Sequence, residues 1–260
     1  MPKIALSGKG GVGKTTWAAL LAGAYAKRGD KVLAIDADPS PCLANALGLP
    51  LVLANAIVPI ADMEALIYER TGAQPGTTGG YFRLNPKVDD IPDRFSAVYK
   101  GIKLLQLGHV EKGGAGCICP ESTLLKALVT HLLLARRDVV ILDMYAGTEH
   151  LGRGTADSVD AFLIVVEPSA RSLATAKQME QLARDIHIEH LYLLANRVRN
   201  GADREYIVAN GPTLPLLGVL PEDPAVLEAD RMGIPVYEHA PQLLAEAERV
   251  IAELDKLSAA

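Results

Sequence analysis

Short apolar runs and longer helical patterns alternate along most of this chain. The apolar runs that predict buried strands cover residues 3–6, 31–35, 102–107, 139–143, 161–166, 191–195 and 216–220. Helical patterns are predicted at residues 16–27, 61–70, 124–134, 169–186 and 242–257. Because strands that alternate with helices form βαβ units, the pattern predicts an α/β fold with a doubly wound, mainly parallel sheet flanked by helices.

Length and composition narrow this expectation. The 260 residues, of which 49% are hydrophobic, suit one large domain over residues 1–260. A net charge of −5 argues against nucleic-acid binding, which needs a basic surface. The first residues lead directly into a strand and leave no room for a signal peptide, and no apolar stretch reaches the roughly 20 residues that span a bilayer. We therefore expect a cytoplasmic protein that binds neither nucleic acid nor membrane.

A glycine-rich loop joins the first predicted strand to the first predicted helix. It satisfies the pattern G-x-x-x-x-G-K-[ST], in which backbone N–H groups and a helix N-terminus hold phosphates. Lys14 is expected to reach the β- and γ-phosphates of ATP, Thr15 to ligate Mg²⁺, and Thr16 to bond the α-phosphate. A chance match is disfavoured because strand, loop and helix agree. The predicted nucleotide-binding residues here are Gly8, Lys9, Gly10, Gly11, Val12, Gly13, Lys14, Thr15 and Thr16.

Lys9 is a second lysine early in this loop. With it, the loop resembles the deviant Walker A motif, K-G-G-x-G-K-[ST]-T, of the P-loop NTPases that include MinD, ParA and nitrogenase iron protein. In that family the lysine reaches the nucleotide of a partner subunit. The resemblance therefore implies a homodimer in which Lys9, like Lys14, is catalytic and stabilises the transferring phosphoryl group in trans. A solvated loop lysine is the alternative.

Three aspartates end predicted strands beside the phosphate loop. Asp36 and Asp38 follow the second strand, and Asp143 ends the apolar run of residues 139–143 in the manner of a Walker B motif. Carboxylates in this position suit the Mg²⁺ shell. By resemblance to the family's first switch, Asp38 is assigned to activating the attacking water. An acidic turn at residues 36–41 and a helix cap at Asp143 are the structural alternatives.

The residues that contact the adenine base of the nucleotide are assigned by resemblance alone. Family members place an asparagine at a strand end on the adenine, which points to Asn196 and Arg197, and they pack a later loop over the base, which points to Pro221 and Glu222. An amide offers both a donor and an acceptor to the purine edge. An asparagine that stabilises a turn is the alternative.

Two cysteines one residue apart, Cys117 and Cys119, lie on a glycine-rich loop before the helix predicted at residues 124–134. A helix N-terminus favours the thiolate, which binds metal. One such pair supplies two ligands, whereas Ni²⁺ and Zn²⁺ sites take four, so a symmetric dimer would complete the shell. Buried cysteines that behave as small hydrophobes, or a redox pair, are the alternatives. Cys42 has no near partner and is expected to pack.

Taken together, these motifs resemble nickel-insertion ATPases of the CooC and AcsF type. The resemblance covers essentially the whole chain and includes residues 36–43, 85–88, 112–119 and 143–151. Tyr145 departs from it, since the family more often has glycine there. The resemblance implies an ATPase, with ATP or ADP and Mg²⁺ as ligands, that assists nickel insertion into carbon monoxide dehydrogenase or acetyl-CoA synthase.

Two other readings of the sequence stay open. A partitioning or positioning ATPase of the ParA and MinD type would share the phosphate loop but would not need the cysteine pair, and the acidic last helix disfavours its membrane-binding version. A redox ATPase like nitrogenase iron protein needs a cysteine beside the second switch, where this chain has Met144, Tyr145 and Ala146.

Overall fold

The computed structural model describes residues 1–76, 81–108, 119–145 and 158–257. Within these ranges the chain forms an eight-stranded sheet with the order β3-β4-β2-β5-β1-β6-β7-β8. The strands are β1 (Lys3–Gly8), β2 (Val32–Ala37), β3 (Ala97–Tyr99), β4 (Ile102–Gln106), β5 (Val139–Met144), β6 (Ala161–Val166), β7 (Leu191–Val198) and β8 (Leu216–Pro221). Every neighbouring pair is parallel except β3 and β4.

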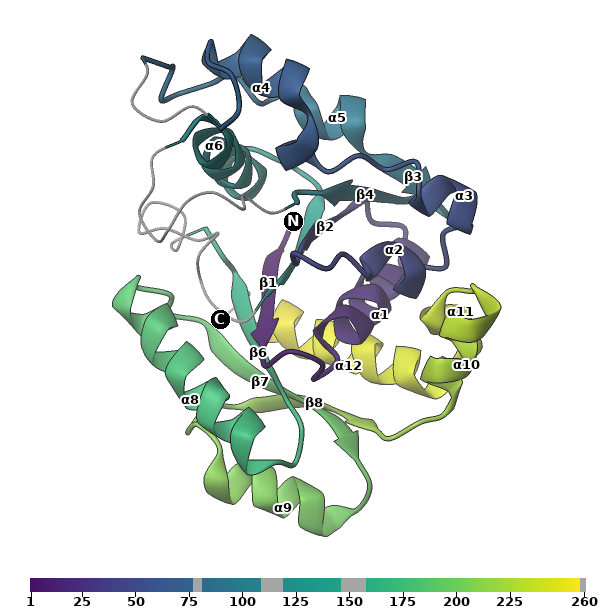
Figure 1. The fold of residues 1–260 in the computed structure, drawn as a ribbon. Coiled ribbons are helices and arrows are strands. Elements are labelled where there is room, and N and C mark those ends of the chain that lie inside the picture. The colour runs from purple at the N-terminus through teal and green to yellow at the C-terminus, as the bar shows by residue number, and fades with distance from the viewer. Residues whose placement is uncertain (77–80, 109–118, 146–157, 258–260) are drawn as a thin grey trace.

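Helices cover both faces of the sheet (Figure 1). One face carries α1 (Lys14–Lys27), α2 (Leu43–Ala46), α10 (Ala225–Met232), α11 (Val236–His239) and α12 (Pro241–Leu257). The other carries α4 (Glu64–Thr71), α5 (Ile91–Phe95), α6 (Pro120–Leu134), α8 (Ala170–Asp185) and α9 (Gly201–Asn210). The short helices α3 (Leu51–Ala54) and η1 (Ile60–Asp62) lie in the connection between α2 and α4. This arrangement confirms the predicted doubly wound α/β fold.

The helix predicted at residues 61–70 is divided in the structure. A 3₁₀ turn, η1, is followed by Met63 with φ −84° and ψ 74°, and α4 begins only at Glu64. The antiparallel edge strand β3 was not predicted. It has three residues, too few for an alternating pattern, and pairs with β4 through a turn at Lys100 and Gly101, both of which have positive φ.

The order of the strands brings distant residues to one edge of the sheet. β1 lies between β5 and β6, so the loop that follows β1 projects from the centre of the sheet. The register places Asp36 of β2 directly opposite Asp143 of β5. Crevices at the carboxyl ends of parallel strands, where the strand order reverses, are the usual ligand sites of such sheets.

The last helix packs on the core. α12 buries Leu243, Val250 and Leu254 against α1 and β8. On its polar side, Glu248 pairs with Lys27 of α1, and Asp255 pairs with Arg28, the residue that caps α1. Among the helices of the described ranges, none has the length and apolar character needed to cross a membrane.

Candidate nucleotide-binding site

The glycine-rich loop leaves β1 and enters α1 with an unusual backbone at its last glycine. Gly13 caps the helix with φ 99°, a left-handed conformation that side chains disfavour. A β-carbon here would lie 1.9 Å from the amide nitrogen of Asn196. That amide in turn donates to the carbonyl oxygen of Val12 at 2.8 Å. Glycine is therefore required both by the backbone and by the close approach of β7.

Thr15 and Asp143 are in direct contact below this loop. The Thr15 hydroxyl donates to one carboxylate oxygen of Asp143 at 2.6 Å. The other oxygen, Oδ1, is buried and has no hydrogen-bond partner among the described residues. A hydroxyl and an orphaned carboxylate oxygen are the hard oxygen donors that Mg²⁺ prefers. The residues present thus fit the Mg²⁺ ion that a P-loop ATPase uses.

Asp36 completes a buried pair of carboxyl groups with Asp143. Burial is the main cause that raises the pKa of Asp143 to about 7 and that of Asp36 to about 6. A neighbouring carboxylate contributes to each rise: Asp36 acts on Asp143, and Asp38 acts on Asp36. Both oxygens of Asp36 accept backbone N–H groups, from Asp38 at 3.2 Å and from Leu43 at 2.9 Å. Asp36 therefore anchors the loop of residues 38–43, a role that the sequence did not predict.

The side chains assigned to catalysis surround the loop. Lys14 is buried, with its ammonium group 3.4 Å from the carbonyl oxygen of Lys9. Lys9 is half-buried, and its ammonium group contacts the carbonyl oxygen of Gly10 at 3.4 Å at the surface. Asp38 accepts the backbone N–H of Ser40 at 2.9 Å. Among the residues that the structure describes, the side chain of Lys9 makes this one backbone contact, and its ammonium group lies where a second molecule can reach it.

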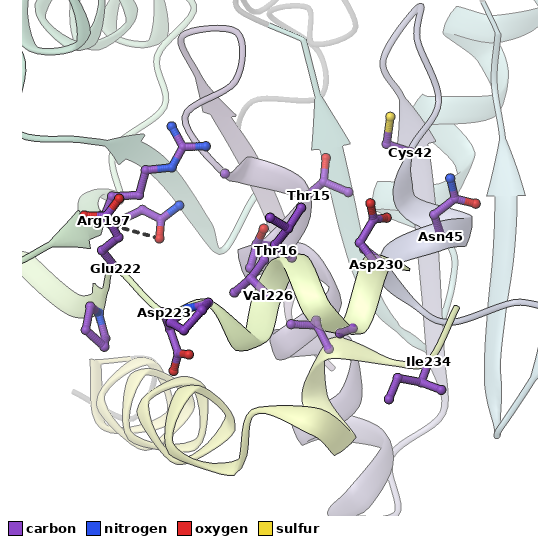
Figure 2. A pocket seen from close by; sticks show the side chains of 18 residues that line it. Thr15, Thr16, Cys42, Asn45, Arg197, Glu222, Asp223, Val226, Asp230 and Ile234 are labelled. Atoms are coloured by element: carbon purple, nitrogen blue, oxygen red, sulfur yellow. Dashed lines mark hydrogen bonds between the residues drawn. The ribbon is translucent and has the colours of Figure 1, made fainter. Parts of the chain in front are cut away.

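A cavity of about 790 Å³ opens beside Thr15 and Thr16 (Figure 2). Arg197 and Glu222 lie at one end of it, and Cys42 lies at the other. Its volume is within the range of small-molecule sites, roughly 300–1,000 Å³. The residues that the sequence assigned to the nucleotide base line this cavity, as do others that it did not assign: Cys42, Asn45, Asp223, Val226, Leu227 and Asp230.

Asn196 and Arg197 belong to an irregular part of β7. The pairing of β7 with β8 shifts register between Ala195 and Val198, and Arg197 adopts φ 55°. This bend turns Asn196 beneath the loop, where its amide donates to Val12. Its oxygen accepts the backbone N–H of Arg197 at 3.0 Å. Asn196 thus makes structural bonds, the alternative noted above, while it also lines the cavity.

The cysteines lie in different settings. Cys42 is exposed at the cavity, so the expectation that it packs in the core is wrong. The reason is that α2 begins only after it, at Leu43. Cys119 is 3% exposed and caps α6, its sulfur accepting the N–H of Ser122 at 3.4 Å. Cys117 lies outside the described residues, so the structure places only one of the two predicted metal ligands, Cys119.

Comparisons with known proteins show the family of this chain. The model of the CobQ/CobB/MinD/ParA nucleotide binding domain matches residues 3–236. The carbon monoxide dehydrogenase accessory protein CooC of Rhodospirillum rubrum is 46% identical over 97% of this chain and 95% of its own. An uncharacterized ATP-binding protein of Methanocaldococcus jannaschii is 47% identical over 90% of both chains.

Solved structures show the same fold. The MinD cell division protein of Aquifex aeolicus superimposes with a TM-score of 0.67 and 22% identity, covering 100% of this chain and 98% of its own. A ParA family ATPase of Chlorobium tepidum gives a TM-score of 0.68 at 20% identity, over 95% of this chain and 98% of that one.

The phosphate loop, the Thr15–Asp143 pair and the adjoining cavity define a P-loop ATPase, and the chain belongs to the CobQ/CobB/MinD/ParA nucleotide-binding family. Within that family it is a CooC-type ATPase of the MinD/ParA class, which confirms the resemblance drawn from the sequence.

Proposed function

We propose that this chain is an ATP-hydrolysing maturation factor that helps to insert nickel into carbon monoxide dehydrogenase, with acetyl-CoA synthase as the alternative client. The observation that carries the proposal is the 46% identity to CooC over 97% of the chain. Nickel is here the cargo of the reaction. Its binding at Cys117 and Cys119, a nucleotide-dependent homodimer and a cytoplasmic location are parts of the proposal that rest on the sequence.

The chemistry assigned to the loop follows from where its side chains lie. Lys14 places positive charge on the β- and γ-phosphates, and the backbone N–H groups of residues 10–15 surround the phosphate chain. Thr15 and Asp143 would hold Mg²⁺, which would neutralise charge that develops on the phosphoryl oxygens. Asp38 orients the attacking water. Asp36 acts in the same shell and keeps Asp38 in place through the backbone contact that it accepts.

Lys9 completes the site from a second copy of the chain. Its ammonium group lies at the surface and makes one backbone contact within the described part of the chain, so it can reach a neighbouring triphosphate. A cation that arrives only when two subunits close would stabilise the transition state and not the resting state, which makes hydrolysis dependent on dimerisation. The same closure would bring two copies of the Cys117–Cys119 loop together.

The cysteine at the start of α6 supports the metal-binding part of the proposal. The Sγ atom of Cys119 accepts the backbone N–H of Ser122 in the first turn of the helix, so it lies at the helix N-terminus. Two such loops supply four sulfur ligands, enough for Ni²⁺ or Zn²⁺. Either metal suits this ligand set, and the proposed client favours nickel.

A reconstitution assay tests the proposal. Nickel-deficient carbon monoxide dehydrogenase is incubated with limiting Ni²⁺ and the protein, with ATP or with a non-hydrolysable analogue, and CO oxidation is measured. We expect activation that requires ATP hydrolysis and is lost in a Cys117→Ser, Cys119→Ser double variant. Cys42→Ser is the matched control and should activate the client normally. A parallel arm with nickel-free acetyl-CoA synthase distinguishes the two clients.

Equal activation by free Ni²⁺ alone, or by the double cysteine variant, would contradict the proposal. The remaining candidate is then a positioning ATPase of the ParA and MinD type. The polar side of α12 weighs against its membrane-binding version, because Glu248 and Asp255 pair with α1 and Glu246 accepts the N–H of Val219 at 2.7 Å. This helix is fixed to the core by both of its sides.

A further inference from the structure

A second groove lies on the other face of the sheet from α1, between α6 and the extended segment of residues 84–88. Its volume is about 490 Å³, and we call it the α6 groove. Pro86 and Val88 are buried within it, and Leu84 is 64% exposed. From α6, it is lined by Ser122, Lys126 and His131, among others. The groove thus combines an apolar wall with the polar face of one helix.

The charge of this groove is opposite to that of the whole chain. The chain carries a net charge of −5, yet no aspartate or glutamate is found among the described residues that line the groove. Lys126 is exposed and makes no ion pair within the described part of the chain, and neither does exposed Arg83, next to Leu84. Two carboxylates adjoin the lining residues in sequence. Asp89 lies 3.8 Å from the ammonium group of Lys87, and Glu121 is buried and accepts the backbone N–H of Gly76. Unpaired positive charge therefore flanks an apolar surface.

The position of the groove connects it with the cysteine loop. Helix α6 begins immediately after Cys119, and Ser122 and Thr123 in its first turn belong to the groove. The groove continues along the helix to Thr130 and His131 in its last turns. A polypeptide bound there would lie beside Cys119, one of the two residues proposed to carry nickel.

We propose that the α6 groove binds an extended acidic segment of the client enzyme whose apolar side chains enter the groove. Carboxylates of that segment pair with Lys126 and Arg83, and an apolar side chain contacts Leu84 and Val88. A nucleic acid would need a larger basic surface than these few cations provide. The identity of the client rests on the proposed function, whereas the chemistry of the groove does not.

Two probes test binding in the groove and the identity of the client independently. The first is a labelled random copolymer of glutamate and tyrosine, which carries both chemistries, and the second is nickel-deficient carbon monoxide dehydrogenase. Binding of each is measured by fluorescence anisotropy at low salt, because exposed ion pairs are screened. The variants are Lys126→Glu and Arg83→Glu. Lys31→Glu makes the same change of charge at an exposed position at the opposite end of the sheet.

We expect the double reversal of Lys126 and Arg83 to weaken copolymer binding about tenfold or more, and each single reversal by less. Lys31→Glu should bind like the wild type, and ATP hydrolysis and the melting temperature should be unchanged in all four variants. Unchanged copolymer binding in the double variant would overturn the proposal. So would a loss confined to duplex DNA or anionic vesicles.

The two proposals fail in different ways. If the copolymer binds through the groove but carbon monoxide dehydrogenase does not bind at all, the proposed chemistry of the groove is confirmed and the assigned client is wrong. If the enzyme binds equally well to wild type and to the double reversal, the client docks elsewhere and the groove proposal fails. Protection of backbone amides in residues 84–88 and 122–131 from hydrogen exchange would locate the copolymer directly.

Discussion

Replacing the buried Asp143 with asparagine is predicted to stabilise the metal-free protein at pH 8 and to slow ATP hydrolysis strongly. The carboxyl group is 1% exposed, and one of its oxygens has no partner among the described residues. Burial raises its pKa from 3.8 to about 7. Ionising a buried carboxyl group destabilises the folded protein, so its presence here is explained by function and not by stability. We infer that the carboxylate binds a cation.

The sign of the effect follows from proton binding. Because the pKa of Asp143 is higher in the folded than in the unfolded chain, the folded state binds more protons between about pH 4 and pH 7. Stability contributed by this group therefore falls as the pH rises through that window. At 1.36 kcal/mol per pKa unit, ionisation costs at most about 4 kcal/mol at pH 8. Asp36, with a pKa of about 6, also lowers the stability of the folded protein as the pH rises.

Thermal unfolding in EDTA at pH 5 and pH 8 measures this effect. Asparagine cannot ionise, so Asp143→Asn should melt several degrees above the wild type at pH 8, at about 2–4 °C per kcal/mol for a chain of this size. The gain should be smaller at pH 5. ATP hydrolysis should fall by about a hundredfold or more, since Mg²⁺ loses a carboxylate.

Asp230→Asn serves as the control, because Asp230 is an exposed carboxylate on the same cavity. It should show no stabilisation that depends on pH. If Asp143→Asn melts below the wild type at pH 8 without metal, the reasoning from burial is refuted, and Asp143 is then a structural partner of Thr15.

Three further perturbations have defined outcomes. Gly13→Ala should prevent nucleotide binding in an ATP-binding assay, because its β-carbon meets the Asn196 amide and the backbone is left-handed, and Asn196→Gly should restore part of the loss. Lys9→Ala should keep ATP affinity within about twofold but reduce turnover by about a hundredfold or more, as loss of a cation in trans does. Asp90→Asn should lower the unfolding free energy in urea by about 1–2 kcal/mol, since the charge-assisted bond of buried Arg70 to Asp90, 2.8 Å long, becomes a bond to a neutral amide. Equal turnover for Lys9→Ala, or a stable Asp90→Asn, would contradict the assignment concerned.

Much of the site could be predicted because its signals are local. The phosphate loop carries its chemistry within nine consecutive residues. The strands beside β1 in the sheet, β5 and β6, are continuous apolar runs. Asp143 ends such a run, so its place at the sheet edge followed from the parallel fold. Its contact with Thr15 then depends only on β1 and β5 being neighbours.

Other features depend on contacts between distant segments. That Asp36 faces Asp143 requires the register of β2 on β5, which no local pattern contains. That Cys42 and Asp230 line one cavity requires α2 and α10 to be adjacent. The bend at Arg197 depends on how β8 pairs with β7. Sequence patterns identified the strands and the loop, whereas the walls of the cavity emerge only from their packing.

Sedimentation velocity with metal analysis tests most directly whether two copies of the chain complete one nickel site. With Mg²⁺, a non-hydrolysable ATP analogue and nickel, the protein should sediment as a dimer that holds one nickel ion. The Cys117→Ser, Cys119→Ser variant should lose the nickel. Two results would contradict the shared site. One is a wild-type protein that binds nickel as a monomer under these conditions, and the other is a double cysteine variant that binds nickel as tightly as the wild type.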